Sequence, residues 1–177
     1  MEYKTDKYMY LPFYEEEFKR LSPKTLLEIG VWEGESLKLW QNMFPHTKVW
    51  GVEINPKFKK ENVFIGNQSD GQFLKSVVEI TGIPDIIIDD GSHKVSDQQA
   101  SFETLFPLMK SGGVYIIEDL CTSYWTDHEL HFVDGKMTTE YLLDLIMENG
   151  RDSHHKDFLS DILSVKFYRS IAFITKR

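Results

Sequence analysis

This sequence has only one cysteine and fewer basic than acidic residues, and each shortage excludes a class of protein. Its single cysteine, Cys121, rules out an internal disulfide and is typical of a protein from a reducing cytoplasm. Lysine and arginine together number 20 against 28 aspartate and glutamate residues, which leaves a net charge of −8. Because binding to a phosphate backbone requires a basic surface, we expect no nucleic-acid partner and favour a small-molecule substrate.

Long apolar runs are also absent. No stretch approaches the roughly 18 consecutive apolar residues of a membrane-spanning helix. Residues 1–6 are too polar for a secretory signal, so we expect a cytoplasmic protein without a membrane partner. Hydrophobic residues make up 41% and charged residues 27% of the 177 residues, which is typical of one globular domain with its own hydrophobic core.

Apolar runs suited to buried strands alternate with helical patterns, which predicts an α/β fold around a mostly parallel sheet. Five strands are expected, at residues 25–29, 48–53, 63–65, 85–90 and 114–117. An antiparallel hairpin at 164–168 and 171–174 would complete a seven-stranded sheet with helices on both faces. One of these helices is expected from Ser96 to Met109, with Ser96 and Gln99 as a capping box.

The first strand leads into a glycine turn, in which Glu28 precedes Gly30 and Gly34 opens the next helix. Glycines there let a ligand approach the backbone, although a turn without a ligand is the alternative. Gly-x-Gly-x-x-Gly is absent, which disfavours a nicotinamide dinucleotide. Glu28 instead suits a cofactor with an ammonium or sulfonium group, namely S-adenosylmethionine.

Glu53, at the tip of the second strand, is placed to accept the ribose hydroxyls. The loop after the third strand either contacts the adenine or is an ordinary polar turn; its residues are Gln68, Ser69 and Asp70.

The fourth and fifth strands both end in acidic residues. Asp90, Glu118 and Asp119 offer hard oxygen ligands for Mg²⁺ or another divalent cation, whose charge would offset their mutual repulsion. Asp89 points to the opposite face of a regular strand, so we expect it to support the site or to contact the cofactor. His93 follows in the next loop and is a candidate general base. The alternatives are separate solvated carboxylates and a histidine bonded to the backbone.

With these residues assembled, the chain resembles the S-adenosylmethionine-dependent methyltransferases of the Rossmann-like class. Within them it is similar to the metal-dependent macrolide sugar O-methyltransferases of the mycinamicin type, whose relatives are often labelled cephalosporin hydroxylase. The resemblance covers most of the chain and rests on residues 5–7, 27–31, 51–53, 66–70, 88–93, 117–119 and 122–125. Its specific elements are Asp-Asp-Gly-Ser-His at 89–93 and Glu-Asp at 118–119.

The resemblance implies a role for each matched residue. The implied Mg²⁺ ligands are Asp90, Glu118 and Asp119, with His93 as the base. The implied cofactor contacts are Glu28, Gly30, Glu53 and the loop from Gln68 to Asp70. Thr5 and Lys7 match a segment that folds over the cofactor end of the site, so residues 1–21 are expected to form an N-terminal lid and helix of a single domain spanning 1–177.

The implied activity is methylation of a hydroxyl on a small molecule, a sugar or glycoconjugate. Exposed aromatic residues, expected at Tyr8, Tyr10 and Trp125, would line either the acceptor mouth or the interface of a homo-oligomer. A metal-independent methyltransferase and a non-catalytic S-adenosylmethionine-binding partner protein both remain open, and EDTA sensitivity and a methyl-release assay separate them from the main hypothesis. The absence of Gly-x-Ser-x-Gly disfavours a covalent hydrolase.

Overall fold

The computed structural model describes residues 6–124, 135–147 and 159–177. Its strands are β1 (Thr25–Ile29), β2 (Lys48–Glu53), β3 (Val63–Ile65), β4 (Ile86–Asp89), β5 (Val114–Ile117), β6 (Ile162–Tyr168) and β7 (Ile171–Lys176). Its α-helices are α1 (Leu11–Phe18), α2 (Glu35–Met43), α3 (Gly71–Thr81), α4 (Val95–Leu105) and α5 (Thr138–Met147). Two short 3₁₀ turns matter for the site, η1 (Asp6–Met9) and η4 (Leu120–Tyr124).

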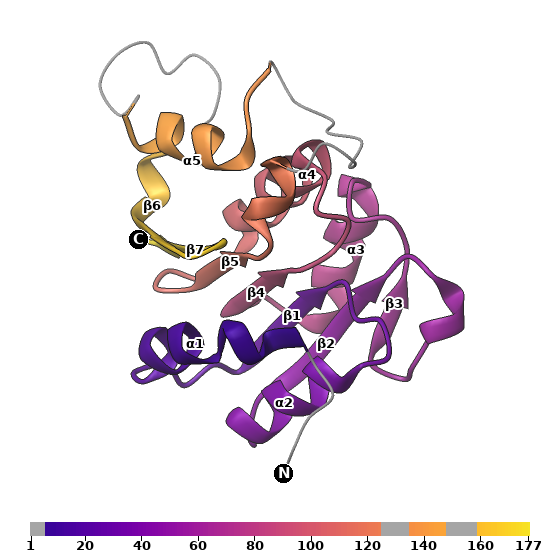
Figure 1. The fold of residues 1–177 in the computed structure, drawn as a ribbon. Coiled ribbons are helices and arrows are strands. Elements are labelled where there is room, and N and C mark those ends of the chain that lie inside the picture. The colour runs from indigo at the N-terminus through magenta and orange to yellow at the C-terminus, as the bar shows by residue number, and fades with distance from the viewer. Residues whose placement is uncertain (1–5, 125–134, 148–158) are drawn as a thin grey trace.

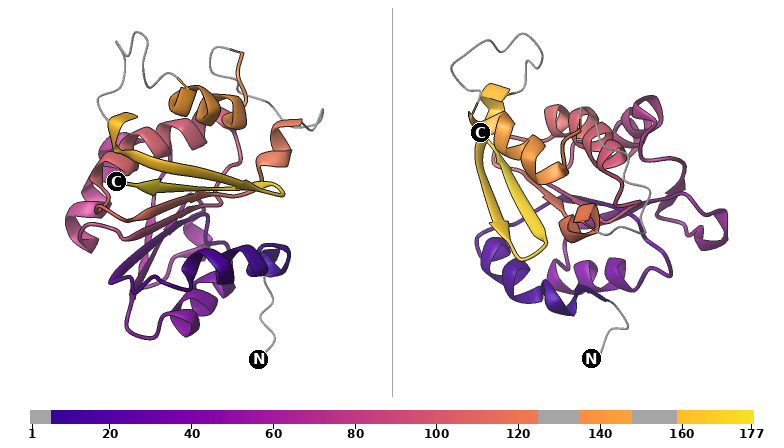
Figure 2. Two further views of the ribbon diagram at one scale, coloured as in Figure 1. Left: turned by 90° about the vertical axis from the view of Figure 1, so that its left-hand side faces the viewer. Right: turned by 45° about the horizontal axis from the view of Figure 1, so that its top comes forward.

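The strands form one seven-stranded sheet in the order β3-β2-β1-β4-β5-β7-β6. The first five strands are parallel, and β7 runs antiparallel to both β5 and β6. Helices α1 and α2 cover one face of the sheet, and α3, α4 and α5 cover the other (Figures 1 and 2). The seven-stranded, mostly parallel sheet with a C-terminal antiparallel hairpin, predicted from the alternation of apolar runs, is confirmed, and so is the Rossmann-like class that the resemblance implied.

Two hydrophobic cores explain why the central strands are mostly apolar. Alternate side chains of a strand point to opposite faces, so Ile87 packs with α3 and α4 whereas Ile86 and Ile88 pack with α1 and α2. All residues of β1, β4 and β5 are buried, as expected for parallel strands covered on both faces. The α1 side is rich in aromatic contacts, such as that between Tyr14 and Trp40, whose rings lie 4.8 Å apart.

The direction in which the chain adds strands to the sheet reverses between β1 and β4. From β1 the chain first builds outward to β2 and β3, and then returns to the other side of β1 to form β4 and β5. In open α/β sheets, ligands bind at the carboxyl ends of the strands where the order reverses in this way. Gly30 and Asp90 follow directly on β1 and β4, so the predicted site residues lie at this point.

The expected capping box at Ser96 and Gln99 is wrong. Helix α4 begins one residue earlier, at Val95, and its N-cap is Lys94, which makes no side-chain capping bond. Val95 is fully buried, so packing of this residue against the core moves the helix start ahead of the polar signal. Within the described residues, no helix is both long and apolar enough to cross a membrane.

Candidate functional site

A cavity of about 650 Å³ opens at the carboxyl ends of β1, β2 and β4. This volume is typical of small-molecule binding sites. Its walls come from the glycine turn, the tips of β2 and β4, and the loops after β3 and β4. The predicted site residues that line it are Lys7, Gly30, Gly34, Glu53, Gln68, Asp90 and His93.

The glycine turn lets the backbones of two strand ends meet. Gly30 has φ +84°, in the left-handed region, and a methyl group on it would overlap the carbonyl oxygen of Asp90. Gly34 has φ +81° and precedes α2 as its N-cap. Glycine at position 30 is therefore required both by backbone conformation and by the close approach of β4.

Gly30→Ala is expected to lower the free energy of unfolding by at least about 3 kcal/mol, because left-handed strain and overlap with fixed backbone add together. Gly112→Ala is the matched control. Gly112 has a similar φ of +77°, but an added methyl group would meet nothing within 4 Å. The control should cost only about 1–2 kcal/mol. Urea denaturation measures both, and equal losses would contradict the steric part of this explanation.

Glu53 holds the glycine turn from the tip of β2. Its Oε2 accepts the backbone N–H groups of Val31 at 3.1 Å and Trp32 at 2.8 Å, and its Oε1 accepts that of Asn55 at 2.9 Å. A carboxylate can accept about four hydrogen bonds, so Glu53 keeps capacity for a ligand hydroxyl in the cavity that it lines.

Trp32 is a cavity residue that the sequence reasoning missed. Its side chain is 68% exposed and its φ of +46° is unusual for a residue other than glycine. The only sequence signal was its position between two glycines, which does not distinguish a ligand contact from a surface residue.

Glu28 lies behind the turn, on the α2 side of the sheet. It is fully buried and accepts hydrogen bonds from Ser36 Oγ at 2.7 Å and Trp40 Nε1 at 3.0 Å. Burial raises the pKa of Glu28 to about 7, against the opposing effect of Lys7, whose Nζ lies 3.6 Å from Oε1. Glu28 is not among the residues that line the cavity, so its predicted cofactor contact stays a prediction.

Asp89 lies on the face of β4 opposite to that of Asp90, as strand alternation predicts, and supports the cavity from that side. It is fully buried and accepts hydrogen bonds from Gln68 Nε2 at 3.0 Å, from Tyr115 OH at 3.2 Å, and from Ser101 Oγ. Burial raises the pKa of Asp89 to about 6. Gln68 in turn accepts the backbone N–H of Ser92 at 2.7 Å, so Asp89 fixes a side chain that lines the cavity.

The other two predicted loop residues have local structural partners. Asp70 is the N-cap of α3, and its Oδ1 accepts the backbone N–H groups of Gln72 at 3.0 Å and Phe73 at 3.1 Å. Ser69 Oγ donates to Asn67 Oδ1 at 2.9 Å. Neither Ser69 nor Asp70 lines the cavity, and their predicted cofactor contacts stay predictions.

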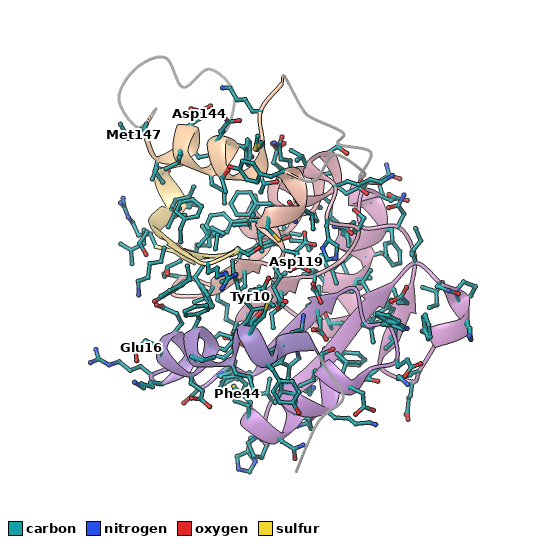
Figure 3. The ribbon with its side chains drawn as sticks, viewed as in Figure 1. Tyr10, Glu16, Phe44, Asp119, Asp144 and Met147 are labelled. Atoms are coloured by element: carbon teal, nitrogen blue, oxygen red, sulfur yellow. The ribbon has the colours of Figure 1, made fainter. Side chains whose placement is uncertain are left out.

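Two of the residues that line the cavity, Asp90 and His93, converge with Asp119, which follows β5 and is not part of the lining. One ligand atom from each of Asp90, His93 and Asp119 lies within 4.8 Å of the other two. His93 Nε2 is 3.6 Å from Asp119 Oδ2. Tyr10 OH donates to Asp119 Oδ1 at 2.5 Å, and Figure 3 shows the two residues side by side near the centre of the molecule.

The backbone of this cluster is strained. His93 has φ +59° and Asp119 has φ +54°, both in the left-handed region. Such conformations cost roughly 1–3 kcal/mol each and are concentrated at functional sites. In addition, His93 Nδ1 is buried without a hydrogen-bond partner among the described residues. Carboxylate oxygens are the ligands that Mg²⁺ and Mn²⁺ prefer, so Asp90 and Asp119 are compatible with the predicted metal, whereas the imidazole of His93 beside them is not a preferred Mg²⁺ ligand.

Glu118 differs from its predicted partners in position. Its Oε2 accepts a hydrogen bond from Lys7 Nζ at 2.8 Å and its Oε1 accepts one from Tyr14 OH. It is buried, and burial raises its pKa against the opposing effect of Lys7. The structure thus groups Asp90 and Asp119 with His93, whereas the buried Glu118 is not part of this group. The role of Glu118 as a metal ligand stays a prediction.

The predicted aromatic residues have different surroundings. Tyr8 is exposed, whereas Tyr10 is buried against Asp119 and is therefore not an exposed acceptor contact. Trp125 and Thr5 lie outside the described residues.

No family model matches the chain. Among curated proteins, it is 42% identical over 128 residues to 8-demethyl-8-(2-methoxy-alpha-L-rhamnosyl)-tetracenomycin-C 3'-O-methyltransferase of Streptomyces olivaceus, which is 65% of this chain and 33% of that protein. It is 37% identical over 140 residues to mycinamicin VI 2''-O-methyltransferase of Micromonospora griseorubida, which is 70% of this chain and 35% of that protein. The chain spans about half or less of the length of the curated relatives that it matches.

Solved structures agree with this similarity. The MycE methyltransferase from the mycinamycin biosynthetic pathway, in complex with Mg, SAH and mycinamycin VI, matches with a TM-score of 0.82 at 29% identity. The match covers 98% of this chain and 52% of that one. A putative caffeoyl-CoA O-methyltransferase from Staphylococcus aureus matches with a TM-score of 0.65 at 17% identity, over 96% of this chain and 83% of that one, which shows a shared fold only.

Proposed function

Because this chain is related in sequence and fold to S-adenosylmethionine-dependent sugar O-methyltransferases, we propose that it methylates a hydroxyl of a glycosylated small molecule. The observation that carries the proposal is the meeting of two features at one sheet edge. The cavity that begins at the glycine turn and Glu53 is also lined by Asp90 and His93, each of which has a ligand atom within 4.8 Å of one from Asp119.

S-adenosylmethionine is the proposed methyl donor, and the residues around the cavity suit its parts. Gly30 lets the donor approach the backbone, Glu53 would accept its ribose hydroxyls, and Gln68 would face its adenine. Asp89 holds Gln68 in place, so this side of the site is organised before a ligand enters. Relatives solved with SAH support this assignment.

Mg²⁺ is the proposed metal, held by Asp90 and Asp119 with Glu118 as the third predicted ligand. When bound, such an ion lowers the pKa of a neighbouring hydroxyl. The acceptor specificity is proposed to be a sugar hydroxyl, as in the names of the curated relatives.

His93 is the proposed general base. Its Nε2 would accept the proton of the acceptor hydroxyl while the oxygen–methyl bond forms and the methyl–sulfur bond breaks. Sulfur keeps the electron pair of that bond, so the donor leaves as neutral S-adenosylhomocysteine. Asp119, 3.6 Å from Nε2, would stabilise the resulting imidazolium. Holding both reactants in this geometry can contribute roughly 7–11 kcal/mol to catalysis.

The test measures donor binding and methyl transfer separately. We expect calorimetry to detect S-adenosylhomocysteine binding, and isotope-labelled S-adenosylmethionine to transfer its methyl group to glycosylated acceptors. EDTA followed by dialysis should abolish transfer, and added Mg²⁺ or Mn²⁺ should restore it. The aglycone of the same acceptor is the control and should stay unlabelled.

Each alternative predicts a different outcome of this test. Transfer that persists after removal of the metal would favour the metal-independent methyltransferase. Donor binding without transfer to any of the acceptors would favour a non-catalytic binding protein. Absence of donor binding would contradict the proposed function altogether.

A further inference from the structure

Lys7 places an ammonium group among the acidic residues at three neighbouring strand tips. Its Nζ lies 2.5 Å from Asp90 Oδ2, 2.8 Å from Glu118 Oε2 and 3.6 Å from Glu28 Oε1. These carboxylates belong to β1 and to the residues that directly follow β4 and β5. The Lys7 side chain is only 1% exposed, so the ammonium has exchanged water for these three carboxylates.

Burial of an ammonium is unfavourable unless nearby anions compensate for it. Around Lys7 that compensation is strong enough for the carboxylates to raise its pKa despite burial. The reverse also holds, because Glu28 and Glu118 are buried carboxylates that would repel each other and Asp90 without a cation. Among the described residues, Lys7 therefore supplies a cation to this acidic group.

The segment that carries Lys7 contacts every predicted metal ligand. Tyr10 and Tyr14, on the same stretch of chain, donate hydrogen bonds to Asp119 and Glu118 respectively. The two tyrosines are neutral donors and are compatible with a nearby divalent ion. Lys7 is not, because its charge repels such an ion at the oxygens of Asp90 and Glu118.

We propose that Lys7 is a tethered cation that competes with the divalent metal for Asp90 and Glu118 and so lowers the metal affinity of the site. Entry of the metal displaces the Lys7 ammonium from these two carboxylates, and loss of the metal lets the ammonium return to them. Lys7 is a positioning residue in this scheme, since it acts through the carboxylates. The inference rests on the proposed function, because it concerns the metal site of that function.

Lys7→Met tests the competition by the sign of its effect. A purely structural role predicts weaker metal binding in this variant, because the carboxylates would lose their arrangement. Competition predicts that Mg²⁺ or Mn²⁺ binds at least about tenfold more tightly than to the wild type. Isothermal titration calorimetry with the metal alone measures the affinity, and Lys7→Arg, which keeps the charge, should remain close to the wild type.

Lys110→Met is the matched control for the loss of one positive charge. Lys110 Nζ lies 3.0 Å from Asp85 Oδ1, just before β4, whereas Asp90 follows the other end of this strand. Its removal should leave the metal affinity unchanged. Equal or weaker binding by Lys7→Met, with metal binding by the wild type intact, would overturn the competition and leave the proposed function standing. Absence of metal binding in both the wild type and Lys7→Met would contradict the competition and the metal-dependent reaction together.

A measurement on the wild type covers the case in which Lys7→Met does not fold. In protein labelled with ¹⁵N at its lysine side chains, the buried Lys7 ammonium should give a signal protected from fast exchange with water. Added Mg²⁺ should remove or shift this signal, with Lys7→Arg as the assignment control. A signal that persists unchanged at saturating Mg²⁺ would overturn the proposal.

Discussion

Replacement of His93 by asparagine is expected to lower turnover by roughly 10²–10⁴-fold, the usual contribution of a positioned general base. Affinity for S-adenosylhomocysteine should change little, because the cavity walls at Gly30 and Glu53 remain intact. Asparagine is preferable to alanine here. The backbone of residue 93 has φ +59°, and asparagine tolerates this left-handed conformation better than most residues.

The two effects are separated by steady-state kinetics and calorimetry. His46→Asn is the matched control, because His46 is exposed between α2 and β2, away from the lining of the cavity. It should leave both turnover and donor affinity unchanged. Turnover of His93→Asn within a factor of about 3 of the wild type would remove His93 from the proton transfer, since a lost base costs far more.

The arrangement of the strands follows from local sequence. Residues 25–29, 86–89 and 114–117 are mostly apolar runs, and a glycine or an acid stands at or directly after the end of each. Such runs are typical of parallel strands that are buried on both faces of a sheet. Alternation along β4 also predicted that Asp89 and Asp90 face opposite sides of the sheet. The start of α4 was not predictable in this way, because packing of Val95 outweighs the polar signal at Ser96.

The partners of the site residues depend on distant parts of the chain. Glu118 binds Lys7, which is 111 residues away in the sequence, and strand periodicity sets the face of a residue but not its partner. Lys7 was assigned to the site only through the resemblance. Asp70 shows the opposite case. An acid just before a helix is a common N-cap, so the sequence carried a local signal for its structural role, although Asp70 was assigned to a cofactor loop or a polar turn.

Asparagine in place of Asp119 is expected to lower turnover by roughly 100-fold or more, because the metal loses a charged ligand and the imidazolium loses its counterion. The fold should tolerate the change to within about 1 kcal/mol. Asparagine has nearly the same shape, tolerates the φ of +54°, and can still accept the hydrogen bond from Tyr10. Denaturation should therefore separate lost activity from lost stability.

Excess metal distinguishes the role of Asp119 from that of His93. Raising the Mg²⁺ concentration should restore part of the turnover of Asp119→Asn, because a higher concentration offsets weakened metal binding. It should restore none of the turnover of His93→Asn.

The double variant of His93→Asn and Asp119→Asn adds a second criterion. Asp119 Oδ2 lies 3.6 Å from His93 Nε2, so once the base is absent the loss of its counterion should matter little. The double variant should then be less impaired than the product of the two single losses, as expected for residues that act as a unit. Fully multiplicative losses would mean that Asp119 serves the metal alone and does not assist the base.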